Sequence, residues 1–119
     1  MHLSPENLDA HFKYVSEMLK PGGKYIFATL NPAYELLKAG RVLADGEAYE
    51  YAHGKSGEYG TFYHYYKSRE FYEKTIEQYF EIEEVTPCLP ITDAYKDSHA
   101  RYYDQAVPMA LVYTLRTRV

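Results

Sequence analysis

The 119-residue sequence contains no tryptophan, a single cysteine and no apolar run that approaches the ~20 residues of a membrane-spanning helix. Cys88 cannot form a disulfide within the chain, and the N-terminus has no basic start followed by an apolar stretch. These absences exclude a disulfide-rich scaffold and give no sign of export. We therefore expect a reducing, cytoplasmic setting and no membrane association.

The sequence also lacks a positive excess and the spacings typical of metal sites. The net charge is -4, with acidic and basic residues interspersed, which argues against nucleic acid as a partner. The five histidines have no close ligand spacing and Cys88 has no nearby partner, so we expect no metal. No phosphate loop, nucleophile elbow or cysteine–histidine signature indicates another class of enzyme.

The composition and length of the chain predict one globular domain spanning residues 1–119. Apolar residues make up 46% of the chain and charged residues 25%, and the length suits a single core. The chain has fifteen tyrosines, many of them between Tyr49 and Tyr79. A phenol combines an apolar body with a polar tip, which suits a half-wet pocket or an interface as well as strands that favour aromatics.

The first third of the chain predicts a helix, a strand and a second helix. Ser4-Pro5-Glu6 is a favourable helix start, and an apolar stripe follows until Lys20-Pro21-Gly22-Gly23 ends the helix. Residues 24–30 are apolar on both alternating faces, which predicts an interior strand covered on both sides. Asn31-Pro32 stops this strand, and a short helix over about 33–39 ends at Gly40.

The remaining sequence predicts an insertion, a helix and two strands. Turn signals within about 41–67 indicate a hairpin-like insertion, and Ser68 then caps a helix. A strand over 80–89 contains Pro87, which indicates a sheet edge or an early end. The segment 90–106 is polar and irregular, and residues 107–117 form a final, central strand.

The run LSPENLDAHFKYVSEMLKPGGKYIFATL from Leu3 to Leu30 resembles the part of class I S-adenosylmethionine-dependent methyltransferases in which a helix turns through Leu-Lys-Pro-Gly-Gly into the fifth strand. The later FYHYYKSREFYEKTIEQYFEIEEV resembles the segment leading into the family's last helix and sixth strand, and VPMALVYTLR resembles its closing strand. The likeness covers nearly the whole chain. It implies an α/β, partial Rossmann-like methyltransferase fold. In this fold we expect a three-stranded mixed sheet that corresponds to family strands five, seven and six, together with flanking helices and the hairpin-like insertion.

The resemblance implies the C-terminal part of a methyltransferase domain whose cofactor is S-adenosylmethionine. The family's glycine-rich turn and acidic ribose ligand have no counterpart in the 119 residues, so no cofactor-binding residue is predicted and this chain alone should be inactive. Strand 24–30 should present an open edge that pairs with a second copy or with a separate N-terminal half. A truncated enzyme, an excised fragment and a genuine half-protein are all compatible with the sequence.

By the same resemblance, the loop after the fifth strand and the insertion shape the pocket for a small-molecule methyl acceptor. His53 and His64 are candidate general bases there. The candidate substrate-binding residues are Asn31, Tyr34, Tyr63 and Tyr66. All of these except Tyr34 have a structural alternative: the histidines as surface positions of a hairpin, Tyr63 and Tyr66 as packing residues, and Asn31 as a turn residue.

Two further functions remain open at the level of sequence. The chain could be a non-catalytic binding or self-association module derived from a methyltransferase. It could also be one half of a split enzyme. An in-frame upstream region with a glycine-rich turn favours the truncated enzyme, and a real start site favours the module.

Overall fold

The computed structural model describes residues 3–52, 61–88 and 107–118. In chain order, the elements are α1 (Pro5–Met18), β1 (Lys24–Leu30), α2 (Pro32–Ala39), β2 (Ala48–Ala52), β3 (Thr61–Tyr65), α3 (Arg69–Glu77), β4 (Phe80–Cys88) and β5 (Ala110–Thr117). Every predicted helix and strand is present in the described residues. The irregular segment 90–106 lies outside them.

The predicted helix ends are confirmed by their caps. The Ser4 side chain accepts a hydrogen bond from the Asn7 amide, and the Ser68 side chain accepts one from the Phe71 amide. Gly40 ends α2 in the left-handed region with φ 73°, a conformation that favours glycine. At the turn into β1, a Cβ on Gly23 would lie 2.9 Å from the Lys20 carbonyl oxygen, so the sharp reversal requires glycine here.

The three-stranded sheet has the order β1-β5-β4. β5 runs antiparallel to both neighbours, with Tyr113 opposite Phe27 on one side and opposite Val85 on the other. Both pairings are therefore antiparallel, and the mixed character predicted for this sheet is not seen among the described strands. β4 lies at the edge of this sheet, where Pro87 is tolerated.

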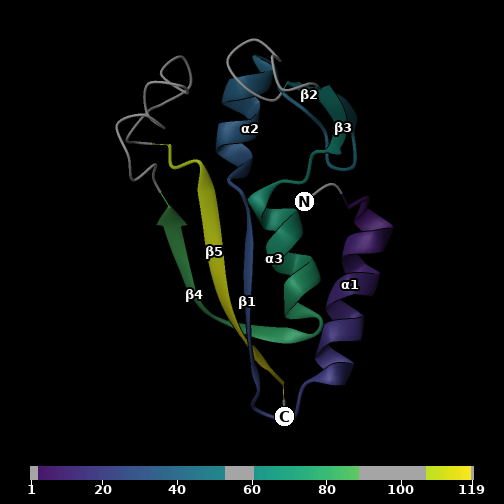
Figure 1. Cartoon of the computed structure of the whole chain (residues 1–119), viewed down its shortest axis with the longest axis vertical. Coiled ribbons are helices and arrows are strands. Elements are labelled where there is room, and N and C mark those ends of the chain that lie inside the picture. The colour runs from purple at the N-terminus through teal and green to yellow at the C-terminus, as the bar shows by residue number, and fades with distance from the viewer. Residues whose placement is uncertain (1–2, 53–60, 89–106, 119) are drawn as a thin grey trace.

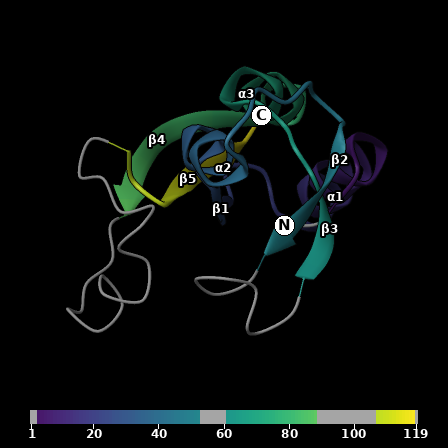
Figure 2. The ribbon, with the colours of Figure 1, turned by 90° about the horizontal axis from the view of Figure 1, so that it is seen from above.

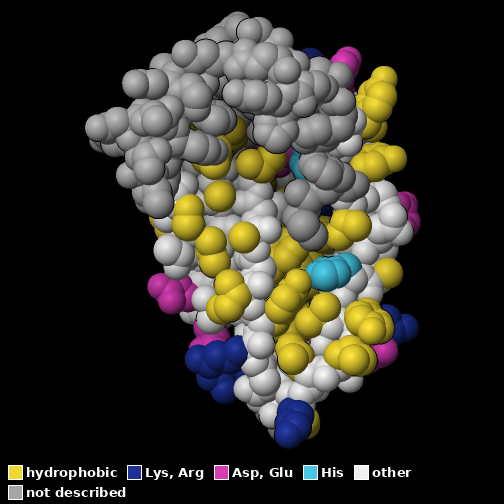
Figure 3. All heavy atoms as spheres, in the orientation of Figure 1, with side chains coloured by type: hydrophobic (Ala, Val, Ile, Leu, Met, Phe, Trp, Pro, Cys, Tyr) yellow, Lys and Arg dark blue, Asp and Glu magenta, His cyan; other side chains and the backbone are white. Residues whose placement is uncertain are grey.

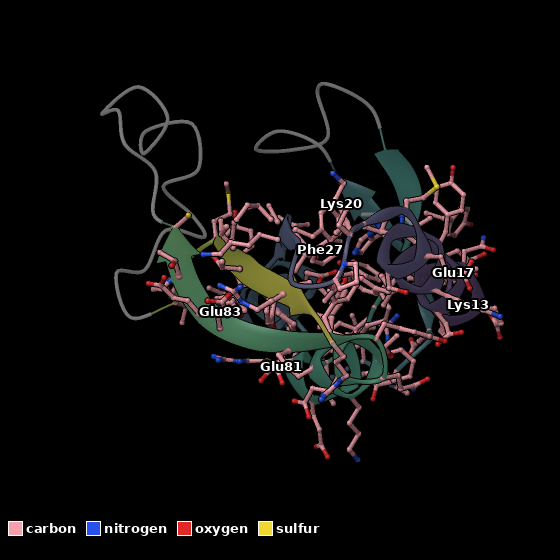
Figure 4. The ribbon with its side chains drawn as sticks, turned by 90° about the horizontal axis from the view of Figure 1, so that it is seen from below. Lys13, Glu17, Lys20, Phe27, Glu81 and Glu83 are labelled. Atoms are coloured by element: carbon pink, nitrogen blue, oxygen red, sulfur yellow. The ribbon has the colours of Figure 1, made fainter. Side chains whose placement is uncertain are left out.

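One face of the sheet is covered by α1 and α3 (Figures 1 and 2). The core between them contains Leu8, Phe12, Phe27, Tyr72, Ile76, Phe80, Leu111, Tyr113 and Leu115. Viewed from below, Phe27 points into this interior, whereas Lys13, Glu17, Glu81 and Glu83 lie at the periphery (Figure 4). The aromatic rings of Phe12 and Phe27 meet edge to face, with centroids 4.8 Å apart.

The expectation that strand 24–30 is covered on both sides is wrong for the described residues. Phe27 and Thr29 are buried, but Ile26 on the opposite face is 58% exposed and Ala28 is also exposed. The apolar pattern indicated two covered faces, yet α1 and α3 pack against the same one. Figure 3 shows hydrophobic side chains gathered on the molecular surface over β1 and β5.

The predicted hairpin-like insertion is confirmed as the antiparallel pair β2–β3. Tyr49 of β2 lies directly opposite His64 of β3, so their side chains share one face of the hairpin. The hairpin lies beside α2, at the end of the molecule where β1 terminates (Figure 1). Leu43, Tyr49 and Tyr66 form a second small core there, against Leu30, Leu36 and Ala39.

Candidate functional site

The polar residues with unusual burial gather where β1 ends and α2 begins, beneath the hairpin. Asn31 forms the junction as the N-cap of α2. Its Oδ1 accepts from the Ala33 amide at 3.1 Å, and its Nδ2 donates to the Pro108 carbonyl at 2.8 Å. Both ends of this side chain are thus engaged in fixing the start of α2 against the segment before β5.

Glu35, one turn into α2, is fully buried. Its Oε1 accepts a hydrogen bond from the Tyr49 hydroxyl at 2.8 Å and lies 2.7 Å from His64 Nε2. The His64 side chain is only 1% exposed. A carboxylate is rarely buried without a partner, because moving the ionised group out of water costs on the order of several kcal/mol. Here the Tyr49 hydroxyl supplies the hydrogen bond, and the His64 ring lies against the same oxygen.

The geometry of the hairpin brings these two partners to one carboxylate oxygen. Because Tyr49 and His64 are cross-strand neighbours, their rings pack edge to face, with centroids 5.8 Å apart and an interplanar angle of 86°. Tyr66, two residues after His64, lies on the same side and is buried beside Tyr49. We refer to Glu35, Tyr49, His64 and Tyr66 as the Glu35 cluster.

Lys67 is a second buried ionisable group next to this cluster. Its Nζ donates to the carbonyls of Leu3 at 2.5 Å and Tyr65 at 2.9 Å, and lies 5.5 Å from the centre of the Tyr72 ring. Burial lowers the pKa of Lys67 to about 8, and attraction to Glu35 opposes that shift. The ammonium group is therefore held by backbone carbonyls and an aromatic face.

The buried hydroxyls around the cluster stay neutral. Burial raises the pKa of Tyr66, and the negative charges of Asp45 and Glu35 raise it further. The pKa of Tyr72 is also raised by burial, against the lowering effect of its hydrogen bond with Thr29, at 3.1 Å. Both phenols therefore stay protonated at neutral pH, and the Tyr72 hydroxyl accepts the hydrogen bond that Thr29 donates.

The structure brings some of the sequence candidates together and separates others. Tyr34, His64 and Tyr66 are buried in the α2–hairpin region, and Asn31 lies at its base. Tyr63 is 71% exposed because it alternates with His64 along β3 and lies on the outer face. His53 lies outside the described residues. The alternative view of His64 as a surface position is wrong, since the hairpin buries it against α2.

Sequence reasoning missed Glu35, Tyr49 and Lys67. A weak signal for Glu35 exists, because it sits among apolar residues in the short helix AYELLKA. The pairing of Tyr49 with His64 depends on the hairpin register, which the turn signals alone did not specify. Lys67 directly precedes the cap of α3 and carries no local pattern that separates it from a surface lysine.

At the carboxyl end of β1, both polar ends of Asn31 are already bonded within the chain. The described residues also contain no group of three or more histidine, cysteine, aspartate or glutamate side chains placed to hold a metal ion. None of the helices in the described ranges is long and apolar enough to cross a membrane.

Comparison with known proteins gives likenesses in structure but not in sequence. No protein-family model and no curated protein sequence matches the chain. The PH0226 protein from Pyrococcus horikoshii matches with a TM-score of 0.62 and 15% identity, over 98% of this chain and 47% of that one.

Two other solved structures carry a functional description. A protein assigned as an S-adenosylmethionine-dependent methyltransferase from Listeria monocytogenes matches with a TM-score of 0.63 and 17% identity, over 93% of this chain and 55% of that one. The S-adenosylmethionine-dependent methyltransferase from Mesorhizobium loti matches with a TM-score of 0.56 and 19% identity, over 93% of this chain and 56% of that one. The chain therefore has the fold of part of these structures and spans about half their length, in agreement with the predicted C-terminal part.

Proposed function

We propose that this chain is the C-terminal part of an S-adenosylmethionine-dependent methyltransferase domain that methylates a small molecule. The observation that carries the proposal is the fold likeness, which extends over 93–98% of the chain but only about half of each matched structure. A cytoplasmic setting is part of this proposal, and the single cysteine, which cannot form a disulfide within the chain, is compatible with it.

The contribution of this chain is the acceptor side of the site. Methyl transfer mainly requires that donor and acceptor be held in line, so a general base and a shaped pocket are what the protein adds. The Glu35 cluster supplies a buried imidazole in His64 and the ring of Tyr66. Tyr34 and Asn31 lie beside it, Tyr63 on the outer face of β3 is a further candidate for contacts with the acceptor, and His53 stays a candidate general base from the sequence alone.

The cofactor side must come from elsewhere, because the 119 residues contain no glycine-rich turn after a first strand. In this proposal, the 119-residue chain alone neither binds S-adenosylmethionine nor transfers methyl groups. The exposed face of β1 and β5, with Ile26 on it, is where the remaining strands and helices of the domain would pack.

The test is calorimetric titration with S-adenosylmethionine and S-adenosylhomocysteine. We expect no binding by the 119-residue chain. We expect saturable binding once it is joined to an in-frame upstream region carrying a glycine-rich turn, or is co-expressed with a separately encoded N-terminal half. Saturable binding by the chain alone would refute the inactivity, and no binding by the completed domain would refute the methyltransferase proposal.

A second candidate is a non-catalytic module that binds a partner or a second copy of itself. The exposed apolar sheet face favours it, because such faces commonly mark contacts between proteins. The two candidates differ in the genomic sequence immediately upstream of Met1. A start site with no in-frame continuation, and no separately encoded cofactor-binding half, would favour the module.

A further inference from the structure

Glu35 has one carboxylate oxygen that is bonded within the chain and one that is not. Oε1 accepts the hydrogen bond from the Tyr49 hydroxyl at 2.8 Å, and the His64 ring lies against the same oxygen. Oε2 is buried and has no hydrogen-bond partner among the residues that the structure describes. Leaving a buried carboxylate oxygen without a donor is costly, so this atom indicates a donor that the described residues do not supply.

The buried cation beside the cluster, Lys67, does not supply that donor. Its Nζ donates to the backbone carbonyls of Leu3 and Tyr65 and lies 5.5 Å from the centre of the Tyr72 ring. Its charge attracts Glu35 at longer range. Within the described ranges, the negative charge of Glu35 therefore has no ammonium or guanidinium group in direct contact with it.

The surroundings of Oε2 favour a cation as its partner. Tyr34 from α2, Tyr49 from β2 and Tyr66 after β3 are buried at this end of the molecule. The face of a phenol ring attracts a cation, and an ionised carboxylate oxygen accepts hydrogen bonds but cannot donate them. An ammonium group offers both the positive charge and the N–H donors that such a place recognises.

We propose that Glu35 Oε2 binds an ammonium group of the small-molecule substrate, an inference that rests on the methyltransferase function proposed above. The ammonium donates an N–H to Oε2, and its charge pairs with the carboxylate. A protonated nitrogen has no lone pair to take a methyl group, so the ammonium serves for binding and another atom of the same molecule accepts the methyl. The substrate class is therefore an amine that carries a second, nucleophilic group.

The proposal requires the hairpin to lift from α2, because the Glu35 side chain is fully buried in the structure. This end of the molecule is held by the small second core of Leu43, Tyr49 and Tyr66, which is separate from the larger core between the sheet, α1 and α3. A segment with few buried apolar contacts opens locally at a lower free-energy cost than the main core. Such opening admits the amine while the rest of the chain stays folded.

The test is an NMR titration of the full chain, without cofactor, with benzylamine and with benzyl alcohol as its neutral analogue. We expect the amine to shift the Glu35 carboxyl carbon resonance and to bind about tenfold more tightly than the alcohol, because its hydrogen bond to Oε2 is charge-assisted. Glu35→Gln should bring the two dissociation constants to within about twofold of each other. Glu50→Gln is the matched control, since Glu50 lies next to Tyr49 and is exposed on β2, and it should leave the ratio unchanged.

Several outcomes would overturn the inference. These are equal binding of the amine and the alcohol by the wild type, a preference for the amine that survives Glu35→Gln, no amine binding by the folded chain, or a long-lived water at Glu35 that the amine does not displace. The wild-type comparison decides the matter even where Glu35→Gln does not fold. None of these measurements requires S-adenosylmethionine. A completed domain that binds the amine but not S-adenosylmethionine would therefore sink the proposed function and leave the amine site standing.

Discussion

Lys67 shows at the scale of one residue how burial sets a measurable property. Its side chain is fully buried, and burial disfavours the charged ammonium form. Two backbone carbonyls and an aromatic ring contact the ammonium group but do not fully offset this cost. Its pKa falls from 10.5 to about 8 in the folded chain. Between these values the unfolded chain binds more protons than the folded one, so stability must rise with pH.

We therefore predict that the free energy of unfolding increases by about 1 kcal/mol between pH 8 and 9.5, discounted for partial solvent screening. Above pH 10 the free energy of unfolding should fall again. Burial raises the pKa of tyrosines such as Tyr72, so they ionise in the unfolded chain at a lower pH than in the folded chain. Urea unfolding at a series of pH values measures the increase. Lys67→Met is the control and should remove it; a wild-type stability that falls over the same interval would contradict the assignment.

The individual residues also show where sequence reasoning stops. His64 could be selected from its residue type, but its burial could not, because that depends on the hairpin folding onto α2. Glu35 was not selected, since an acidic residue in a short helix normally faces water. Asn31 could be interpreted in two ways, and its hydrogen bonds to Ala33 and Pro108 show that it fixes the start of α2.

At the scale of elements, the caps and breakers made most of the fold predictable. Strand 24–30 and the helix after Ser68 follow from local signals that act within a few residues. The final strand begins at Ala110 and not at residue 107, because strand pairing, not local pattern, decides where a strand starts. The position of the hairpin against α2 depends on packing between residues far apart in the sequence, so no local sequence signal predicts it.

Ser68 couples α3 to the insertion, and this gives a prediction. Its side chain caps α3 through the Phe71 amide at 3.1 Å, and its hydroxyl and amide both donate to the Asp45 carboxylate. Ser68→Ala should lower the free energy of unfolding by about 1 kcal/mol or slightly more, since both the cap and a contact across the insertion are lost.

Chemical denaturation of Ser68→Ala should be compared with Ser16→Ala. Ser16 lies inside α1, and its hydroxyl donates to the Lys13 carbonyl in an exposed position, so no cap is lost there. We expect that control to stay within about 0.5 kcal/mol of the wild type. Equal losses in the two variants would mean that the Ser68 cap contributes nothing specific.

At the scale of the whole molecule, the described helices α1 and α3 pack on the same face of the sheet, and residues on its other face are exposed. Ile26 and Ala28 on β1 are exposed, and β1 is the terminal strand of the three in the described sheet. Tyr14 and Met18 of α1 are also largely exposed. In the proposed complete domain this surface is internal. In the 119-residue chain we expect the open edge of β1 in the described sheet to pair with a second copy, as open strand edges commonly do.

We predict that the chain self-associates with increasing concentration and that Ile26→Glu shifts it toward the monomer. A buried, uncompensated carboxylate disfavours association, while the folded monomer should change by less than about 0.5 kcal/mol because Ile26 is 58% exposed. Light scattering across a concentration series measures the change, with Val42→Glu as the matched control because Val42 is 86% exposed and outside the sheet. A wild-type monomer at all concentrations would contradict pairing through this surface. Association unchanged by Ile26→Glu would place the contact on another part of the molecule.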